Sequence, residues 1–185
     1  MGKIVVQMSL SLDGFMEGPD RDISWHMVDE EVHTDVNAYL ETNGAFLQGR
    51  VTHELMVDFW PTADEDPSAP APVREFARIW RDMPKYVFSK TYDRTDWNTT
   101  ILRDVVPEEI QKLKAQTDGD IALGGADLAA SFMRLDLIDG YRLYIDPLVI
   151  GAGKRLFPPG FEAALKLVEE RRFGNGVVLV RYERR

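Results

Sequence analysis

The stretch Asp120-Ile-Ala-Leu-Gly-Gly-Ala-Asp-Leu-Ala-Ala-Ser-Phe-Met133 decides the fold of this chain. Its apolar run Ile121-Ala-Leu123 is too short for a helix and is typical of a buried strand. After the pair Gly124-Gly125, four apolar residues stand at helical spacing: Leu128, Ala129, Phe132 and Leu135. The stretch therefore predicts a strand, a double-glycine turn and a helix, in that order.

The start of this predicted helix is a candidate anion site. A helix N-terminus carries unpaired backbone N–H groups and a partial positive charge, so it attracts anions. Glycine in the turn lets a phosphate approach backbone that a Cβ would shield. A tight strand-to-helix connection that needs glycine only for its dihedral angles explains the same residues. The stretch by itself leaves both interpretations open.

The composition is that of an ordinary globular protein. The chain has 185 residues, 44% of them hydrophobic and 29% charged, and we expect a single domain over residues 1–185. It contains no cysteine, which excludes disulfides, thiolate metal sites and a cysteine nucleophile. The N-terminal residues 1–8 resemble a strand rather than a signal peptide, and no apolar run approaches the length of a membrane span. We therefore expect a cytoplasmic protein.

The net charge of −9 excludes some classes of partner. Non-specific binding to nucleic acid or to acidic lipid needs a positive surface field, which an acidic chain does not supply. We expect neither nucleic acid nor a membrane as a partner. A small anionic ligand stays possible, because it needs only two or three well-placed cations.

Strands and helices are predicted to alternate along most of the chain. The expected strands span about residues 3–9, 45–47, 86–88, 99–102, 121–123, 141–145, 166–173 and 177–183. The expected helices span about residues 29–43, 52–59 and 73–83, followed by one that opens at Pro107 and one after Gly125. We expect Asn43-Gly44 to end the first helix, and Leu55, Met56 and Phe59 to face inward from the second.

This alternation predicts an α/β fold with a parallel sheet and helices on both faces. The hairpin signal Gly174-Asn-Gly176 lies between the last two strands. A tight hairpin makes the final strand antiparallel to its neighbour, so the open sheet is expected to be mixed at one edge.

Polar residues gather at the ends of the predicted parallel strands, where open α/β sheets bind ligands. These ends are Ser9 to Gly14, Gly49 to Thr52, Ser89-Lys90-Thr91 and Gly124-Gly125-Ala126. They supply two cations, three hydroxyls and two turns with backbone N–H groups, which suits a ligand with several phosphates. Each residue also has a purely structural explanation: Arg50 and Lys90 can be surface charges, and Thr52 can be a helix cap.

Several familiar motifs fail on inspection. Gly151-Ala-Gly-Lys-Arg155 resembles the end of a P-loop, but position 148 is Leu where the first glycine is required and Arg155 stands in place of Ser or Thr. His53-Glu54 begins a zinc-protease pattern that Val57 breaks. Neither G-x-G-x-x-G nor G-x-S-x-G is present. We expect no metal, and neither a hydrolase nor a kinase.

Five motifs in the right order resemble the dihydrofolate-reductase fold. They are Ser11-Leu-Asp-Gly14, Gly49-Arg50-x-Thr52, Ser89-Lys90-Thr91, Gly124-Gly125 and Leu156-Phe157-Pro158. More closely, the chain resembles the stand-alone proteins related to the C-terminal reductase domain of bacterial riboflavin biosynthesis. The segments in that style are Ser9 to Gly14, Phe59-Trp60-Pro61 and Pro147 to Phe157. The match covers nearly the whole chain.

The resemblance implies an open, mixed, dihydrofolate-reductase-like sheet of about eight strands and an NADPH-dependent reductase. Carried over by position, Gly49, Arg50 and Thr52 would meet the cofactor phosphates. Ser89, Lys90 and Thr91 would lie at the adenosine 2′-phosphate, which favours NADPH over NADH. Gly124, Gly125, Ala126 and Leu128 would hold the pyrophosphate on a helix start. Ser9 and the loop from Asp13 to Met16 would border the nicotinamide.

The substrate side of the chain departs from true dihydrofolate reductases. Those enzymes place an acidic residue on the first helix to bind the pterin ring, whereas the matching region here holds His33, Thr34 and Asn37. We therefore do not expect folate reduction. The candidate substrate-binding residues are Asp13, Trp25, His33, Asn37, Phe59 and Trp60. Core packing explains Phe59 and Trp60 equally well, and Asp13 can simply shape a turn with Gly14.

Taken together, the sequence predicts an NADPH-dependent reductase of a small, heterocyclic substrate. Asp13 or a bound water is the expected proton donor. Two alternatives stay open: a nucleotide-binding regulatory protein without turnover, and a pyrimidine reductase of riboflavin biosynthesis, which would need a separate deaminase. The family commonly forms homodimers, and we expect Tyr141 to Ile145 to be the edge strand through which two copies pair.

Overall fold

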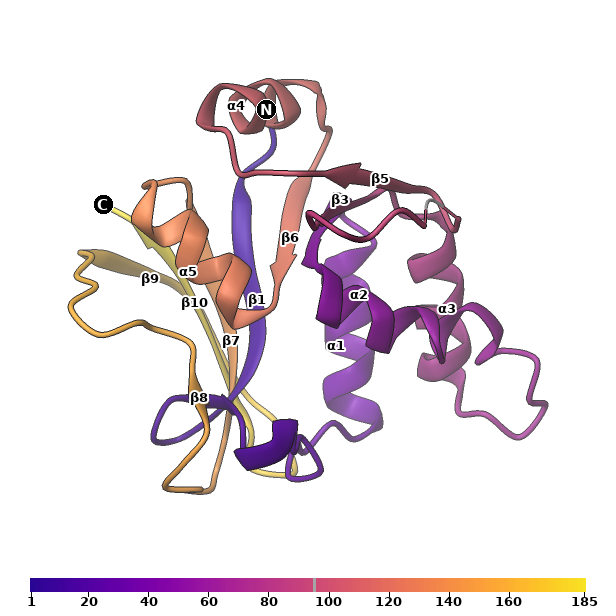
Figure 1. Cartoon of the computed structure of the whole chain (residues 1–185). Coiled ribbons are helices and arrows are strands. Elements are labelled where there is room, and N and C mark those ends of the chain that lie inside the picture. The colour runs from indigo at the N-terminus through magenta and orange to yellow at the C-terminus, as the bar shows by residue number, and fades with distance from the viewer. Residues whose placement is uncertain (95) are drawn as a thin grey trace.

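An eight-stranded sheet runs through the molecule in the order β5-β4-β3-β6-β1-β7-β10-β9 in the computed structural model, which describes residues 1–94 and 96–185 (Figure 1). The strands are β1 (Ile4–Ser11), β3 (Asn43–Gly49), β4 (Lys85–Phe88), β5 (Thr99–Leu102), β6 (Asp120–Gly124), β7 (Gly140–Asp146), β9 (Leu165–Arg172) and β10 (Val178–Arg184). The first six strands in this order, from β5 to β7, are parallel, and β10 is antiparallel to both of its neighbours. A second, small sheet pairs β2 (Phe15–Glu17) with β8 (Lys154–Arg155).

Helices cover both faces of the main sheet (Figure 1). They are α1 (Glu30–Leu40), α2 (Arg50–Val57), α3 (Ala71–Asp82), α4 (Pro107–Gln116) and α5 (Ala126–Arg134), with short 3₁₀ turns at Pro19–Arg21 and Trp60–Thr62. Side chains of α4 and α5 pack with one face of the central strands, and side chains of α1, α2 and α3 pack on the other. The predicted α/β class, with its antiparallel edge, is confirmed.

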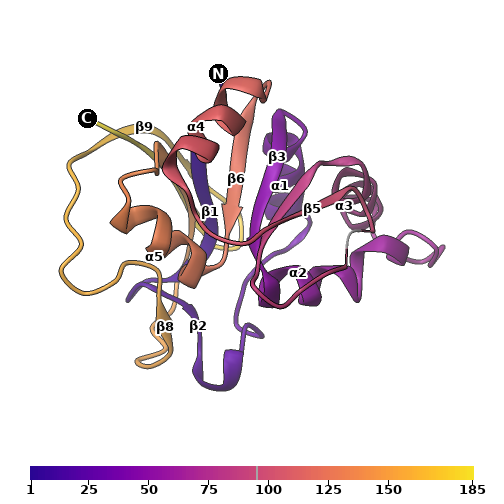
Figure 2. The ribbon, with the colours of Figure 1, turned by 45° about the horizontal axis from the view of Figure 1, so that its top comes forward.

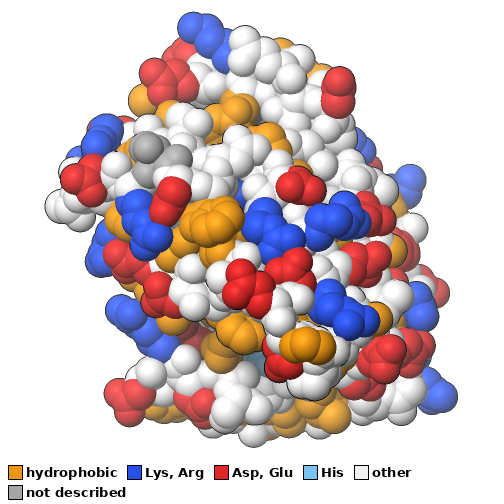
Figure 3. Space-filling model, turned by 90° about the vertical axis from the view of Figure 1, so that its right-hand side faces the viewer, with side chains coloured by type: hydrophobic (Ala, Val, Ile, Leu, Met, Phe, Trp, Pro, Cys, Tyr) orange, Lys and Arg blue, Asp and Glu red, His pale blue; other side chains and the backbone are white. Residues whose placement is uncertain are grey.

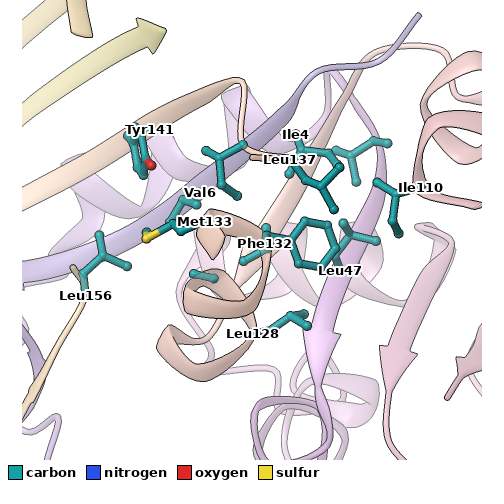
Figure 4. Close-up of a cluster of buried hydrophobic side chains, with 14 of the residues drawn as sticks. Ile4, Val6, Leu47, Ile110, Leu128, Phe132, Met133, Leu137, Tyr141 and Leu156 are labelled. Carbon is teal, nitrogen blue, oxygen red and sulfur yellow. The ribbon is translucent and has the colours of Figure 1, made fainter. Parts of the chain in front are cut away.

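The stretch that opened the sequence forms β6, a glycine turn and the start of α5. Ile121 and Leu123 of β6 are fully buried, and Phe132 of α5 packs in the same cluster (Figure 4). Leu47 of the neighbouring β3 lies close to Phe132 in that view. The large buried area of an aromatic ring makes this contact a main source of the attachment of α5 to the sheet.

The first helix ends earlier than predicted, because Asn43-Gly44 belongs to β3. Helix α1 stops at Leu40, and the following residues lead directly into the strand. At Gly44 a Cβ would lie 2.2 Å from the carbonyl oxygen of Asp118. This glycine therefore permits close packing of two backbones and is not a helix cap.

The inward face of α2 also differs from the prediction. His53 and Val57 are its buried residues, whereas Leu55 and Phe59 are 62% and 55% exposed. The helix starts at Arg50, two residues before the predicted start, and buries positions four apart. The hydrophobic pattern predicted the wrong inner face of α2, because the polar His53 is buried and the apolar Leu55 and Phe59 are exposed.

The predicted edge strand at Tyr141 to Ile145 is wrong. Strand β7 pairs with β1 on one side and with β10 on the other, so it has no free edge. The outer strands of the sheet are β5 and β9. The homodimer stays a prediction, and any strand-to-strand contact between copies would have to use one of these outer strands.

None of the helices that the structure describes is long and apolar enough to cross a lipid bilayer.

Removal of the Phe132 ring tests the attachment of α5. Phe132 is fully buried, so Phe132→Ala is expected to lower the free energy of unfolding by about 3–5 kcal/mol. The matched control is Leu135→Ala at the end of the same helix, where the side chain is 43% exposed and the expected change is within about 0.5 kcal/mol. Urea denaturation measures both. Equal losses in the two variants would contradict this account of the core.

Candidate active site

A cavity of about 540 Å³ lies at the carboxyl edge of the parallel strands, between the starts of α2 and α5. Figure 2 shows these two helices on either side of the end of β6. Many of the predicted cofactor residues line the cavity: Gly49, Arg50, Thr52, Ser89, Lys90, Gly125, Ala126 and Leu128. Ser9, Thr91 and Gly124, which belong to the same prediction, are outside this lining. Ser9 lies on β1 beside Tyr144 of β7.

Two helix N-termini open into this cavity without a side-chain cap. Gly49 precedes α2 and Gly125 precedes α5, and neither can supply a capping side chain. By contrast, the carboxylate of Asp29 accepts a hydrogen bond of 3.0 Å from the Val32 amide at the start of α1. The first turns of α2 and α5 therefore present backbone N–H groups and two positive dipole ends, which together suit a ligand with two anionic groups.

The turn before α5 is built around a left-handed glycine. Gly125 has φ +97°, a conformation that L side chains rarely adopt. A Cβ at this position would lie 2.7 Å from the hydroxyl oxygen of Thr52. The two uncapped helix starts are therefore in close contact through Gly125 and Thr52, and this close approach is possible only because residue 125 has no side chain.

The cations at the cavity are held by partners in the protein. Arg50 donates two hydrogen bonds to Glu54, at 2.9 and 2.7 Å, while Lys90 lies 3.1 Å from Asp104 and Lys154 lies 2.8 Å from Asp127. These pairs are largely exposed, so each contributes little to stability. Their effect is to hold cationic side chains at the rim of the cavity.

Three cationic side chains at this cavity were not among the predicted site residues: Arg21, Arg103 and Lys154. Arg103 donates to the carbonyl oxygens of Ser89 and Tyr92, at 2.9 and 2.8 Å, and so ties the end of β5 to the segment after β4. The signal for Arg103 was present, since it directly follows a predicted strand. Lys154 lies in the P-loop-like segment that was rejected as a nucleotide motif.

The predicted substrate residues lie away from this cavity, on the side of the sheet that carries α1. His33 packs edge-on to Trp60 at 6.0 Å between ring centroids, and Phe59 packs edge-on to Trp60 at 4.9 Å. Figure 3 shows hydrophobic side chains interspersed with charged ones on the face over α2 and α3. Burial lowers the pKa of His33 below its ordinary value, with Glu75 acting in the opposite direction. Trp25 is half-buried against His26.

Asn37 has a structural role in this arrangement. It is fully buried, and its amide nitrogen donates to the Pro72 carbonyl and to Glu75, both at 2.8 Å. These bonds join α1 to α3. A ligand cannot reach the side chain in this conformation, so Asn37 has no part in the proposals below.

Asp13 is held as a carboxylate. The Ser11 hydroxyl, first, and the amides of Gly151 and Ile150 lower the pKa of Asp13 below its ordinary value. The amide bonds measure 2.9 Å to Gly151 and 3.3 Å to Ile150. A carboxylate with a lowered pKa is a poor proton donor near neutral pH. The geometry favours a role for Asp13 in fixing the loop after β7.

Comparison with known proteins gives the family. The model of the RibD C-terminal domain matches residues 2–179. The chain belongs to this family. The family member YyaP of Bacillus subtilis (strain 168), an uncharacterized protein, is 35% identical over 183 residues, which cover 97% of this chain and 94% of YyaP. A second uncharacterized protein of that organism, YwjB, is 28% identical over 96% of this chain and 95% of its own length.

Several solved structures share the fold. A Shewanella sp. PV-4 protein named for riboflavin biosynthesis has a TM-score of 0.77 and 20% identity over 100% of this chain and 99% of that one. A deaminase/reductase of Thermotoga maritima has a TM-score of 0.68 and 17% identity, and this chain spans 57% of it. Dihydrofolate reductase of Enterococcus faecalis, at 14% identity, has a TM-score of 0.65 over 99% of this chain and 96% of that one. The predicted resemblance is thereby confirmed.

His53 lies in the first turn of α2, at the cavity, and is fully buried. Its Nδ1 is 3.1 Å from the Gln48 side-chain oxygen, and its ring stacks on Trp80. Burial, first, and the nearby Lys85 lower the pKa of His53 from 6.5 to about 4. The ring is therefore neutral in the folded protein at physiological pH. Within the described residues, no group of His, Asp or Glu side chains is arranged to hold a metal ion.

This lowered pKa makes stability depend on pH. The unfolded chain binds a proton at His53 more readily than the folded chain does. The neutral ring therefore contributes fully to the free energy of unfolding above the ordinary pKa of 6.5, and this contribution is lost as the pH falls towards 4. The stability difference between the wild type and His53→Gln is expected to shrink by about 2 kcal/mol between pH 8 and pH 5. Urea denaturation at both pH values measures it. A constant difference would show that His53 titrates alike in both states.

Proposed function

We propose that this protein is an NADPH-dependent reductase of a small heterocyclic substrate. The observation that carries the proposal is the pair of uncapped helix starts at Gly49 and Gly125, which open into one cavity. Phosphate groups bind such helix starts through backbone N–H groups and the helix dipole. Membership of the RibD C-terminal domain family supports the same function.

The residues at the cavity suit a dinucleotide. A Cβ at Gly125 would collide with the Thr52 hydroxyl, so this glycine lets the starts of α2 and α5 lie side by side, where their backbone N–H groups suit the two phosphates of a pyrophosphate. Apart from its two chain neighbours, no atom of the described residues lies within 4 Å of the Cβ position at Gly49, so the start of α2 is accessible. When bound, the nicotinamide would supply the hydride, and the chain would bind, orient and shield it.

The segment after β4 is the proposed site of the 2′-phosphate. Ser89, Lys90 and Arg103 line the same end of the cavity. Lys90 can exchange its exposed contact with Asp104 for a phosphate, and the Arg103 guanidinium is fixed by two carbonyl oxygens. A cationic pair at this place would favour NADPH over NADH, because only NADPH carries that phosphate.

A pyrimidine is the proposed class of acceptor. One structural relative is a bifunctional enzyme whose reductase acts on 5-amino-6-(5-phosphoribosylamino)uracil. The proposed substrate side of this chain is formed by His33, Phe59 and Trp60, with Trp25 on the adjoining segment. Aromatic side chains that are partly exposed can stack on a planar ring. Two of the three acidic side chains of α1 are already paired with arginines: Asp35 with Arg142 and Arg171, and Glu31 with Arg171.

Charge removal at Lys90 and Arg103 tests the cofactor assignment. Lys90→Ala and Arg103→Ala are each expected to weaken NADPH binding about tenfold or more and NADH binding less than about threefold. The control is Lys112→Ala on α4, which does not line the cavity and should leave both affinities unchanged. Quenching of the four tryptophans measures binding. Equal losses for both nucleotides would remove the 2′-phosphate assignment.

Turnover is tested with NADPH and two acceptors, 5-amino-6-(5-phosphoribosylamino)uracil and dihydrofolate. Oxidation of NADPH is expected with the aminouracil and not with dihydrofolate, because Glu31 and Asp35 of α1 are paired with arginines and Glu30 is exposed in the first turn. Loss of absorbance at the nicotinamide band measures it. Tight binding of NADPH with no oxidation by either acceptor would favour a nucleotide-binding regulatory protein without turnover.

A further inference from the structure

Asp146 is a buried carboxyl group at the carboxyl end of β7, beside Ser11 at the end of β1. It is 1% exposed. Its Oδ1 accepts a hydrogen bond of 2.8 Å from the Met27 amide, whereas its Oδ2 has no partner. Among the described residues, this is the only buried carboxyl oxygen without one. An unpartnered polar atom inside a protein is costly, so the group calls for an explanation.

The side chain points to the proposed substrate side of the sheet. Along β7, Tyr141 and Leu143 pack with the α4–α5 cluster, whereas Tyr144 packs with Val32 of α1. Because side chains alternate along a strand, Asp146 shares the face of Tyr144. Alternation along β1 places Ser9 on this face as well, two residues from Ser11.

Asp146 is also connected to the rim of the nucleotide cavity. The Met27 N–H group, which donates a hydrogen bond to Asp146, belongs to the segment leading into α1. In the same segment, Nε2 of the neighbouring His26 lies 3.0 Å from the carbonyl oxygen of Met16. Met16 lines the cavity. The group is thus linked through Met27 and His26 to a residue at the rim of the nucleotide cavity.

The other acidic side chains nearby are occupied. Asp13 accepts two loop amides, Asp29 caps α1, and Glu31 accepts from Arg171 and from the Gly174 amide. Asp35 is bonded to Arg142, Arg171 and Tyr144. These contacts stabilise carboxylates and make them poor sources of a proton.

Burial raises the pKa of Asp146 above its ordinary value, and the bond from Met27 and the charge of His26 oppose this only in part. His26 is the titratable side chain that acts on Asp146 within the described residues, and the nearby hairpin contributes the neutral Asn175, bonded to the Met27 carbonyl. A carboxyl group in such surroundings keeps its proton to higher pH than an exposed one.

We propose that Asp146 holds the proton that accompanies hydride transfer, on Oδ2, and passes it to the acceptor through one water molecule. Oδ2 has almost no accessible surface, so the acceptor cannot touch it directly, and the carboxyl group must rotate for the water to reach Oδ2. This inference rests on the proposed reductase function and replaces Asp13 as the donor.

The step balances as a reduction of a C=N or C=O bond. The carbon of the acceptor gains a C–H bond with the hydride's electron pair, and its nitrogen or oxygen gains the proton as the π bond opens. The reduced nicotinamide is oxidised. Asp146 is left as a carboxylate and recovers its proton from solvent.

The first test needs neither nucleotide nor acceptor. Full-length protein labelled with ¹³C at the aspartate carboxyl carbons is titrated by NMR, and the Asp146 signal is identified by its absence in Asp146→Asn. Its midpoint is expected above the value near 3.9 of free aspartate, and Asp13→Asn should not move it. A midpoint at or below that value would overturn the proposal, whatever the outcome of the NADPH titration.

The second test separates proton donation from structure. Asn at position 146 keeps an oxygen for the Met27 amide but carries no transferable proton. With 5-amino-6-(5-phosphoribosylamino)uracil as acceptor, Asp146→Asn is expected to lower kcat about 100-fold or more. The change of kcat with pH around the Asp146 midpoint should also disappear, while the affinity for NADPH stays unchanged. Asp118→Asn, at an exposed aspartate outside the cavity lining, is the control, with an expected loss of less than about threefold. An unchanged pH profile in Asp146→Asn would also overturn the proposal. Failure of NADPH to bind the wild type would instead reject the reductase function.

Discussion

The close contact between Thr52 and Gly125 is the constraint on which the proposed site depends. It brings the starts of α2 and α5 together, although they follow different strands and cover opposite faces of the sheet. The contact is possible because residue 125 has no Cβ and adopts a left-handed conformation. The strand order also contributes: β3 and β6 are parallel neighbours, so the helices that follow them, α2 and α5, begin close together.

The sequence carried enough information for the class of fold and for the phosphate side of the site. Ile121-Ala-Leu123, the double glycine and the helical spacing that follows are local signals, and local signals determine where a strand ends and a helix begins. The sequence alone therefore places the strand ends at Gly49, Ser89 and Gly124 at the carboxyl edge of the sheet. The parallel arrangement then brought most of the predicted residues to the same cavity.

What the sequence did not yield depends on contacts between distant segments. The exposure of Leu55 and the burial of His53 follow from how α2 packs, and a count of apolar residues cannot reveal it. The interior position of β7 depends on the return of the C-terminal hairpin beside it. Asn37 was predicted to bind substrate and Asp146 was not predicted to act, and only the partners of their side-chain atoms distinguish a structural tie from an unpartnered acid.

The ion pairs at the cavity rim have a consequence for how anions would be selected. Arg50, Lys90 and Lys154 are each already neutralised by a carboxylate of the protein. An incoming anion must therefore compete with Glu54, Asp104 and Asp127. The binding free energy that it gains at each cation is the difference between the new contact and the ion pair that it replaces. A simple ion that touches one cation gains little from such an exchange. A ligand whose charges are spaced to engage several cations and both helix starts gains at every point, so the acidic residues of the rim act as a filter for size and charge spacing.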